Sequence, residues 1–162
     1  MPVSNDFSGL DLMDALDLAI LIETEAWKRY TFFAEQIGHR EPWDAAAVFL
    51  SMARSEEEHG RQLGERRQEL FGDATRRVSK PAMSDVEAPD YGSPHWNMSP
   101  LKALQVALES EERAFQFYGE ALKQVTDPVV RELFAELRDE EVEHVRVIKE
   151  AIGKAAGRKG SE

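Results

Sequence analysis

Two stretches of the sequence place a glutamate three residues before a histidine. The first pair is Glu56 and His59 in "SEEEHGRQL", and the second is Glu141 and His144 in "DEEVEHVRVI". Residues three apart lie on the same face of a helix, so the carboxylate and the imidazole of each pair can reach one metal ion. Because acidic residues are frequent in this chain, the spacing alone is a weak signal. The position of each pair on its helix therefore has to show whether the spacing indicates a metal site.

Both pairs fall on stripes of apolar residues. The first stripe advances mostly by four and three residues through Ala45, Phe49, Met52, Glu56, His59, Leu63 and Leu70. The second advances similarly through Val130, Leu133, Leu137, Glu141, His144 and Ile148. Positions spaced in this way share one face of a helix, so each pair occupies positions that are normally apolar and buried. Glu57 and Glu58 are then expected to face solvent.

Two further segments carry glutamates on comparable stripes. Glu23 lies on a stripe with Leu16, Ile20, Trp27, Tyr30, Ala34 and Ile37. In the third helical segment, Glu112 lies on a stripe with Leu101, Leu108, Phe115 and Leu122. Glu109 precedes Glu112 by one turn, at the edge of that stripe. The hydrophobic pattern therefore favours Glu112 as the inward-facing carboxylate of this segment.

Glycine, proline and capping residues divide the chain into helices. The predicted helices span about residues 11–37, 42–71, 100–125 and 128–152, and a flexible tail covers 153–162. Gly38 and Gly72 follow the first two helices, and Pro42 suits the first turn of the second. Ser99-Pro100 and Asp127-Pro128 each combine a capping side chain with a first-turn proline. Since no segment alternates like a strand, the sequence predicts an all-α protein.

The connections predict the topology. Short loops join the first helix to the second and the third to the fourth, so each pair is an antiparallel hairpin. The 28 residues of the loop 72–99 can span a helix about 40 Å long, so the third helix can begin at the far end of the bundle. We therefore expect one domain over 1–162, a four-helix bundle with a long crossover. Two separate hairpins on a linker would bury too little surface.

Distance from the turns places the carboxylates at one depth. Glu23 and Glu56 are equally distant from the Gly38–Glu41 turn, and Glu112 or Glu109 pairs with Glu141 about the Thr126–Asp127 turn. The free-energy cost of burying five unpaired carboxylates, those named here with both Glu109 and Glu112 counted, would be prohibitive. Two divalent cations would neutralise four of the five charges. Oxygen and imidazole ligands without sulfur suit iron or manganese. The alternative is a solvated or salt-bridged cluster.

The composition excludes several other functions. A net charge of −11 argues against binding to nucleic acid or to an anionic membrane. The absence of cysteine excludes disulfides and thiolate sites, and it fits a cytoplasmic protein. The N-terminal residues lack the pattern of a signal peptide. Asp14 and Asp17 interrupt the most apolar stretch, 12–22, which is too short to span a membrane.

Four motifs together resemble the rubrerythrin branch of the ferritin-like superfamily over residues 11–152. They are "IETEAWKRYTFFAEQ" (22–36), "LESEERAFQFYGEAL" (108–122) and the two Glu-x-x-His stretches. The resemblance implies a non-haem di-iron site whose shared carboxylates are Glu23, Glu56, Glu109 and Glu141, with terminal ligands His59 and His144. The family's Glu-x-x-Glu motif implies an extra, exchangeable ligand at Glu112. Which of Glu109 and Glu112 bridges the metals stays open.

The resemblance also implies a function. A tyrosine that hydrogen-bonds near the irons matches Tyr30, the candidate catalytic residue. The implied activity is reduction of hydrogen peroxide by two iron ions, with manganese as an alternative metal. Rubrerythrins typically carry a cysteine-ligated rubredoxin domain, so we expect a separate electron donor of the rubredoxin type here. A homodimer is implied by resemblance alone.

Two alternatives remain at this level. The same ligands could serve a ferroxidase that uses Fe(II) and dioxygen for iron detoxification or storage. A metal-free helical interaction module could instead use the buried layer to fix its register.

Overall fold

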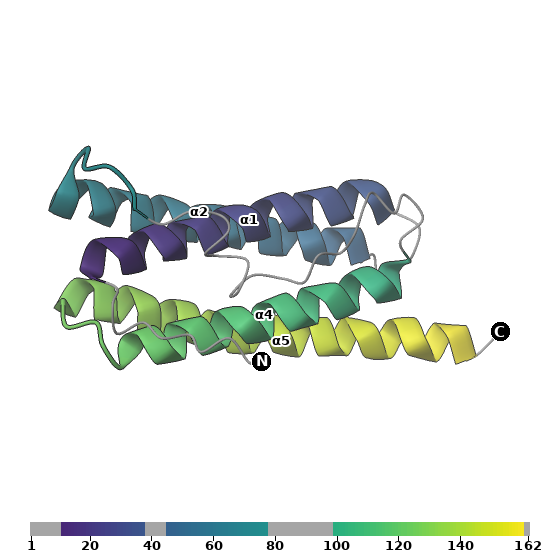
Figure 1. The fold of residues 1–162 in the computed structure, drawn as a ribbon. Helices are drawn as coiled ribbons and strands as arrows, with labels where there is room; N and C mark the ends of the chain where they lie inside the picture. The colour runs from purple at the N-terminus through teal and green to yellow at the C-terminus, as the bar shows by residue number, and fades with distance from the viewer. Residues whose placement is uncertain (1–10, 38–44, 78–98, 161–162) are drawn as a thin grey trace.

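The computed structural model describes residues 11–37, 45–77 and 99–160, and α-helix is the only regular secondary structure in this part of the chain. The helices are α1 (Leu12–Ile37), α2 (Ala45–Phe71), α4 (Pro100–Leu122) and α5 (Pro128–Gly160). They form the predicted four-helix bundle (Figure 1). Among these helices, none is long and apolar enough to cross a membrane.

The topology consists of two helical hairpins. α1 packs along α2, α4 packs along α5, and contacts of α1 with α4 and of α2 with α5 close the bundle. The end of α2 and the start of α4 lie at opposite ends of the bundle (Figure 1). The connection between the hairpins must therefore run the length of the bundle, as its 28 residues predicted. Most of that connection, residues 78–98, lies outside the described residues.

Three of the predicted helix signals are confirmed, at Ser99, Asp127 and Gly72. The Ser99 hydroxyl accepts a hydrogen bond from the Lys102 N–H at 3.1 Å, at the start of α4. The Asp127 carboxylate accepts one from the Val130 N–H at 2.9 Å, at the start of α5. Gly72 adopts a φ of 57°, the left-handed conformation that commonly follows a helix end. The predicted signals at Gly38 and Pro42 lie outside the described residues.

Two predicted boundaries are wrong. α5 continues to Gly160, so the tail predicted to be flexible from residue 153 is helical over most of its length. A glycine in a helix costs about 1 kcal/mol relative to alanine, and here Ile152 and Ala155 pack against the core on either side of Gly153. At the other boundary, α4 ends at Leu122 rather than near 125, and the Val125 N–H closes the turn onto the Ala121 carbonyl at 2.9 Å.

The core has two apolar parts with a polar layer between them. One part lies toward the α4–α5 turn and includes Leu16, Leu63, Phe117, Tyr118 and Phe134. The other lies toward the opposite end and includes Tyr30, Phe33, Phe49, Leu104 and Ile148. In each helix the sequence positions of these two parts flank one buried glutamate. The fold thus places a polar layer near the middle of the bundle, sealed by apolar packing at both ends.

A buried ion pair joins α1 to the end of α2. The Arg67 guanidinium donates to both oxygens of Asp17, at 2.9 and 3.2 Å, and Asp17 is fully buried. The same guanidinium donates to the carbonyls of Gly72 at 2.7 Å and Ala74 at 2.6 Å. One side chain therefore fixes the helix end and neutralises a buried carboxylate.

Replacing Arg67 with methionine should destabilise the fold, because the buried Asp17 would lose both hydrogen bonds of its ion pair and keep only a 4.0 Å contact with the exposed Arg76. Arg66→Met is the matched control, since Arg66 pairs with the more exposed Glu69 and Asp127. Urea unfolding followed by circular dichroism should show a clearly lower midpoint for the Arg67 variant than for the Arg66 variant. Equal midpoints would contradict the structural role of the Asp17–Arg67 pair.

Candidate metal centre

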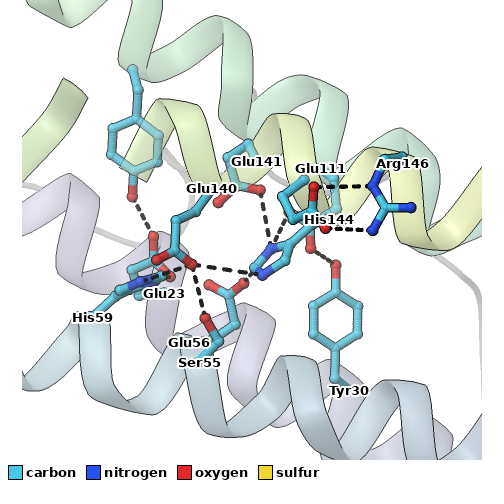
Figure 2. Close-up of polar contacts among 12 residues, drawn as sticks. Glu23, Tyr30, Ser55, Glu56, His59, Glu111, Glu140, Glu141, His144 and Arg146 are labelled. Carbon is cyan, nitrogen blue, oxygen red and sulfur yellow. Dashed lines mark hydrogen bonds and ion pairs between the residues drawn. The ribbon is translucent and has the colours of Figure 1, made fainter. Parts of the chain in front are cut away.

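Each helix of the bundle contributes one buried carboxylate to the central layer. Glu23 comes from α1, Glu56 from α2, Glu111 from α4 and Glu141 from α5, and none is more than 2% exposed. Two imidazoles complete the layer. They belong to His59 on α2 and His144 on α5, which are each 8% exposed (Figure 2).

The six side chains form two overlapping groups of potential ligands. In one group, atoms of Glu56, Glu111, Glu141 and His144 lie within 4.8 Å of one another. In the other, atoms of Glu23, Glu56 and His59 do so. Glu56 belongs to both groups. This arrangement suits two metal ions that share one carboxylate.

Unpartnered polar atoms mark the same place. Among the described residues, five buried atoms of this layer have no hydrogen-bond partner: Glu23 Oε2, Glu56 Oε1, Glu141 Oε2, His59 Nδ1 and His144 Nδ1. A buried polar atom without a partner costs free energy, and nearly all such atoms in proteins are satisfied. Five orphaned carboxylate oxygens and imidazole nitrogens in one layer are the donor set of a metal site. The residues present therefore fit a pair of bound cations.

Electrostatics points the same way. Burial and the negative charges of Glu23 and Glu111 raise the pKa of Glu56 well above its usual value. Burial opposes a charged His144, but the carboxylates of Glu111 and Glu56 outweigh it and raise the pKa of that imidazole to about 11. The metal-free layer therefore holds protons at neutral pH. Two divalent cations would balance all four carboxylates and displace these protons.

Two buried tyrosines hold carboxylates across the bundle. The Tyr118 hydroxyl donates to Glu23 Oε1 at 2.6 Å, and the Tyr30 hydroxyl donates to Glu111 Oε1. Burial, followed by the adjacent carboxylates, holds the pKa of both phenols well above the usual value, so both remain protonated donors. Each tyrosine lies seven residues after the buried glutamate of its own helix. It donates its hydrogen bond to the buried glutamate of the helix that carries the other tyrosine. Each hairpin thus contributes one glutamate and one tyrosine to this pair of hydrogen bonds.

The layer brings together most of the residues singled out in the sequence. Glu23, Glu56 and Glu141 are buried in it together with both predicted histidines, and the Tyr30 hydroxyl reaches it. Their assignment as metal ligands remains a prediction. Glu57 and Glu58 are exposed, as the stripe of α2 predicted.

The prediction for the third helical segment is wrong in register. Glu109 and Glu112 are both exposed, and Glu111 is the carboxylate that points inward. The large side chains of Leu101, Leu108 and Phe115 suggested the wrong face, and Phe115 is 40% exposed. The buried face of α4 carries four alanines, Ala103, Ala107, Ala114 and Ala121, beside larger residues such as Leu104, Phe117 and Tyr118. A shift of one residue turns a helix face by about 100°, so the error moved the prediction to a flank of the helix.

The sequence contained a signal for the correct register. Glu111 precedes Tyr118 by seven residues, as Glu23 precedes Tyr30. With Glu111 as the inward carboxylate, the residue three positions later is Ala114, which is buried and lines a pocket together with Glu111 and Glu141. The extra ligand that the Glu-x-x-Glu resemblance implied at Glu112 is therefore not in this layer.

The sequence analysis did not identify one further charged residue beside the layer, Arg29. Arg29 is 3% exposed, lines the same pocket, and places its guanidinium 5.8 Å from the centre of the Tyr30 ring. No hydrophobic-pattern argument marks a buried arginine, because the pattern treats it as surface.

Comparisons with known proteins identify relatives of the chain. The family model described as Rubrerythrin matches residues 14–152. No curated protein gives a significant match. Among solved structures, an uncharacterised conserved protein from Magnetospirillum magnetotacticum is 32% identical, with a TM-score of 0.70 over 89% of this chain and 95% of that one.

Two more distant structures share the fold. The bacterioferritin-related protein of Bacteroides fragilis, a dodecameric thioferritin, is 21% identical, with a TM-score of 0.75 over 93% of this chain and 89% of that one. A hypothetical protein from Pyrococcus furiosus is 19% identical, with a TM-score of 0.72 over 91% of this chain and 92% of that one. At these identities the likeness supports the ferritin-like architecture alone.

Glu111→Ala should weaken the binding of Co(II) to the metal-free protein by at least about 10-fold, because it removes an inward carboxylate. Glu112→Ala and Glu109→Ala are matched controls on the same helix, and both should bind as the wild type does. Titration calorimetry measures all three affinities. Loss of binding in the Glu112 variant with normal binding in the Glu111 variant would reverse the assignment.

Proposed function

Because this chain belongs to the rubrerythrin family, we propose that it is a non-haem di-iron oxidoreductase that reduces hydrogen peroxide. The observation that carries the proposal is the pair of ligand groups joined at Glu56. Unpartnered donor atoms in both groups support it. The family match and the buried Glu/His layer support a redox role, and peroxide as the substrate is the proposal itself.

The residues that would hold the metals follow from the two groups. Glu23 and His59 would bind one iron ion, and Glu111, Glu141 and His144 the other, with Glu56 shared. When bound, two ferrous ions would supply the two electrons that, with two protons, convert one hydrogen peroxide to two waters. The oxygen and imidazole donors also suit manganese, so the native metal is part of the test.

The protein's own groups have four tasks in this proposal. The carboxylates of Glu23, Glu56, Glu111 and Glu141 would neutralise the charge of the bound cations. Tyr118 and Tyr30 orient Glu23 and Glu111 by hydrogen bonds. Tyr30 is the candidate catalytic residue because its hydroxyl reaches the layer and keeps its proton there at neutral pH. The apolar packing on both sides excludes bulk water.

The proposal requires an external source of electrons. The chain contains no cysteine, so its own residues offer no iron–sulfur centre held by thiolates. A separate donor such as a rubredoxin-type protein would supply them. A homodimer belongs to the same proposal, on the family resemblance.

A ferroxidase that oxidises Fe(II) with dioxygen is the second candidate, and one observation favours it. A cleft of about 230 Å³ between α2 and α5 reaches His59 and carries the carboxylates of Glu58, Glu136 and Glu140. Such a cleft attracts cations. Fe(II) would then be a substrate that enters the centre rather than a resident cofactor.

Metal should stabilise the fold strongly, because the buried carboxylates otherwise repel one another. Saturation at about 1,000 times the dissociation constant adds about 4 kcal/mol. The melting temperature should rise with Fe(II) or Co(II) and fall with a chelator. Acid should release the metal, because the raised pKa values of Glu56 and His144 mean that protons compete increasingly as the pH falls.

Two variants complete the metal-linkage test. Glu56→Ala and His144→Ala should lose metal by elemental analysis while their helical content survives. If the purified wild-type chain carries no metal, and neither added Fe(II) or Co(II) nor a chelator changes its melting temperature, the interaction module is favoured over both redox candidates.

Peroxide should oxidise the reduced, iron-loaded protein with a stoichiometry of one hydrogen peroxide per pair of irons. Anaerobic stopped-flow absorbance of the oxidised centre measures the reaction. Slow oxidation by peroxide together with repeated, fast turnover of added Fe(II) by dioxygen would support the ferroxidase instead.

A further inference from the structure

Both histidines of the centre face the same carboxylate with their outer nitrogen. His59 Nε2 lies 3.3 Å from Glu140 Oε2, and His144 Nε2 lies 4.0 Å from the same oxygen. Figure 2 shows Glu140 between the two imidazoles, which come from α2 and α5. The first distance allows a hydrogen bond, and the second is a close electrostatic contact.

The inner nitrogens point the other way. His59 Nδ1 lies 3.7 Å from Glu23 Oε2, and His144 Nδ1 lies 3.2 Å from Glu56 Oε1. Both Nδ1 atoms are buried without a hydrogen-bond partner. They are therefore the nitrogens available to a metal ion, and a bound metal requires the imidazole proton to sit on Nε2.

Glu140 is held in this position by a residue from the other hairpin. The Ser55 hydroxyl donates to Glu140 Oε2 at 3.2 Å. Ser55 directly precedes Glu56, just as Glu140 directly precedes Glu141. The two hairpins thus match at the candidate ligands but differ at this position, where one offers a hydroxyl and the other a carboxylate. One side chain serves both imidazoles.

We propose that Glu140 is a positioning residue shared by both histidines, which accepts the Nε2 proton of His59 and attracts that of His144. It thereby presents both Nδ1 atoms to the metals. This inference rests on the proposed metal-binding function. A carboxylate on the outer nitrogen fixes the tautomer and ring orientation of a metal-binding histidine and strengthens it as a ligand. Since His59 lies closer, its metal position depends more on Glu140.

A simpler explanation is that Glu140 only adds negative charge near the centre. Its side chain is 47% exposed and lines the acidic cleft with Glu58 and Glu136. Glu136 provides the control for this explanation, because it is an exposed glutamate one turn earlier on α5 that lines the same cleft. Removal of either glutamate removes one negative charge, but only Glu140 contacts both imidazoles.

The experiment compares three variants by titrating the metal-free chain with Co(II). Glu140→Ala should lower the affinity for Co(II) by about 10- to 100-fold, with the larger loss at the metal position that His59 serves. Glu140→Gln keeps an acceptor oxygen without the charge, so it should lose less affinity than Glu140→Ala. Glu136→Ala should bind nearly as the wild type does. Circular dichroism verifies that each variant is folded, which the exposure of both side chains favours.

A second measurement reports the hydrogen bond directly. In the Co(II)-loaded protein, the imidazole N–H protons give paramagnetically shifted proton signals that exchange with solvent. In Glu140→Ala the signal of His59 should broaden through faster exchange, whereas in Glu136→Ala it should stay sharp. A residue that only supports the fold would not produce this difference.

The outcomes separate this inference from the proposed function. Equal losses of affinity in Glu140→Ala and Glu136→Ala would assign the effect to the charge of the cleft and overturn the positioning role. Tight wild-type binding that Glu140→Ala leaves unchanged would overturn it too, with the metal site intact. A folded wild-type chain that binds no Co(II) would overturn the proposed function itself and this inference with it.

Discussion

The mutual repulsion of four buried carboxylates is the constraint on which the rest of this structure depends. Glu23, Glu56, Glu111 and Glu141 meet between two apolar parts of the core, where no bulk water screens their charges. An uncompensated buried ion costs several kcal/mol, so the layer needs cations or protons to exist. In the metal-free chain, Glu56 and His144 hold these protons, because the surrounding layer raises the pKa of both side chains. A pair of divalent metals would supply the same compensation without them.

The two hairpins address this constraint in matching ways. Each contributes a glutamate with a tyrosine seven residues later, and a glutamate with a histidine three residues later. The tyrosines then cross between the hairpins, Tyr30 to Glu111 and Tyr118 to Glu23. Because these bonds join different hairpins, they hold Glu23 and Glu111 in place only when the two halves are docked. The equivalence ends at Ser55 and Glu140, where the side chains differ.

The surroundings of the layer bear on its chemistry. Apolar packing closes it along the bundle axis, while an acidic cleft between α2 and α5 reaches His59 from the side. The cleft attracts cations, and the same Glu140 that lines it contacts both imidazoles. Glu140 therefore lies both on the route by which cations can approach the centre and in contact with the two histidines of the centre. Ala114, where a further carboxylate would stand one turn after Glu111, keeps the buried set at four.

The sequence by itself determined the four helices, the caps at Ser99, Asp127 and Gly72, and the depth of five site residues, because helical periodicity and distance from a turn are local properties. Ser99 and Asp127 begin their helices through bonds to residues three positions away. Only the tertiary structure decided which glutamate of α4 turns inward. Four buried alanines lie on that face, and an alanine carries little hydrophobic signal of its own. The Tyr118–Glu23 bond and the contact of Glu140 with His59 likewise join distant parts of the chain, so they exist only once the two hairpins have packed.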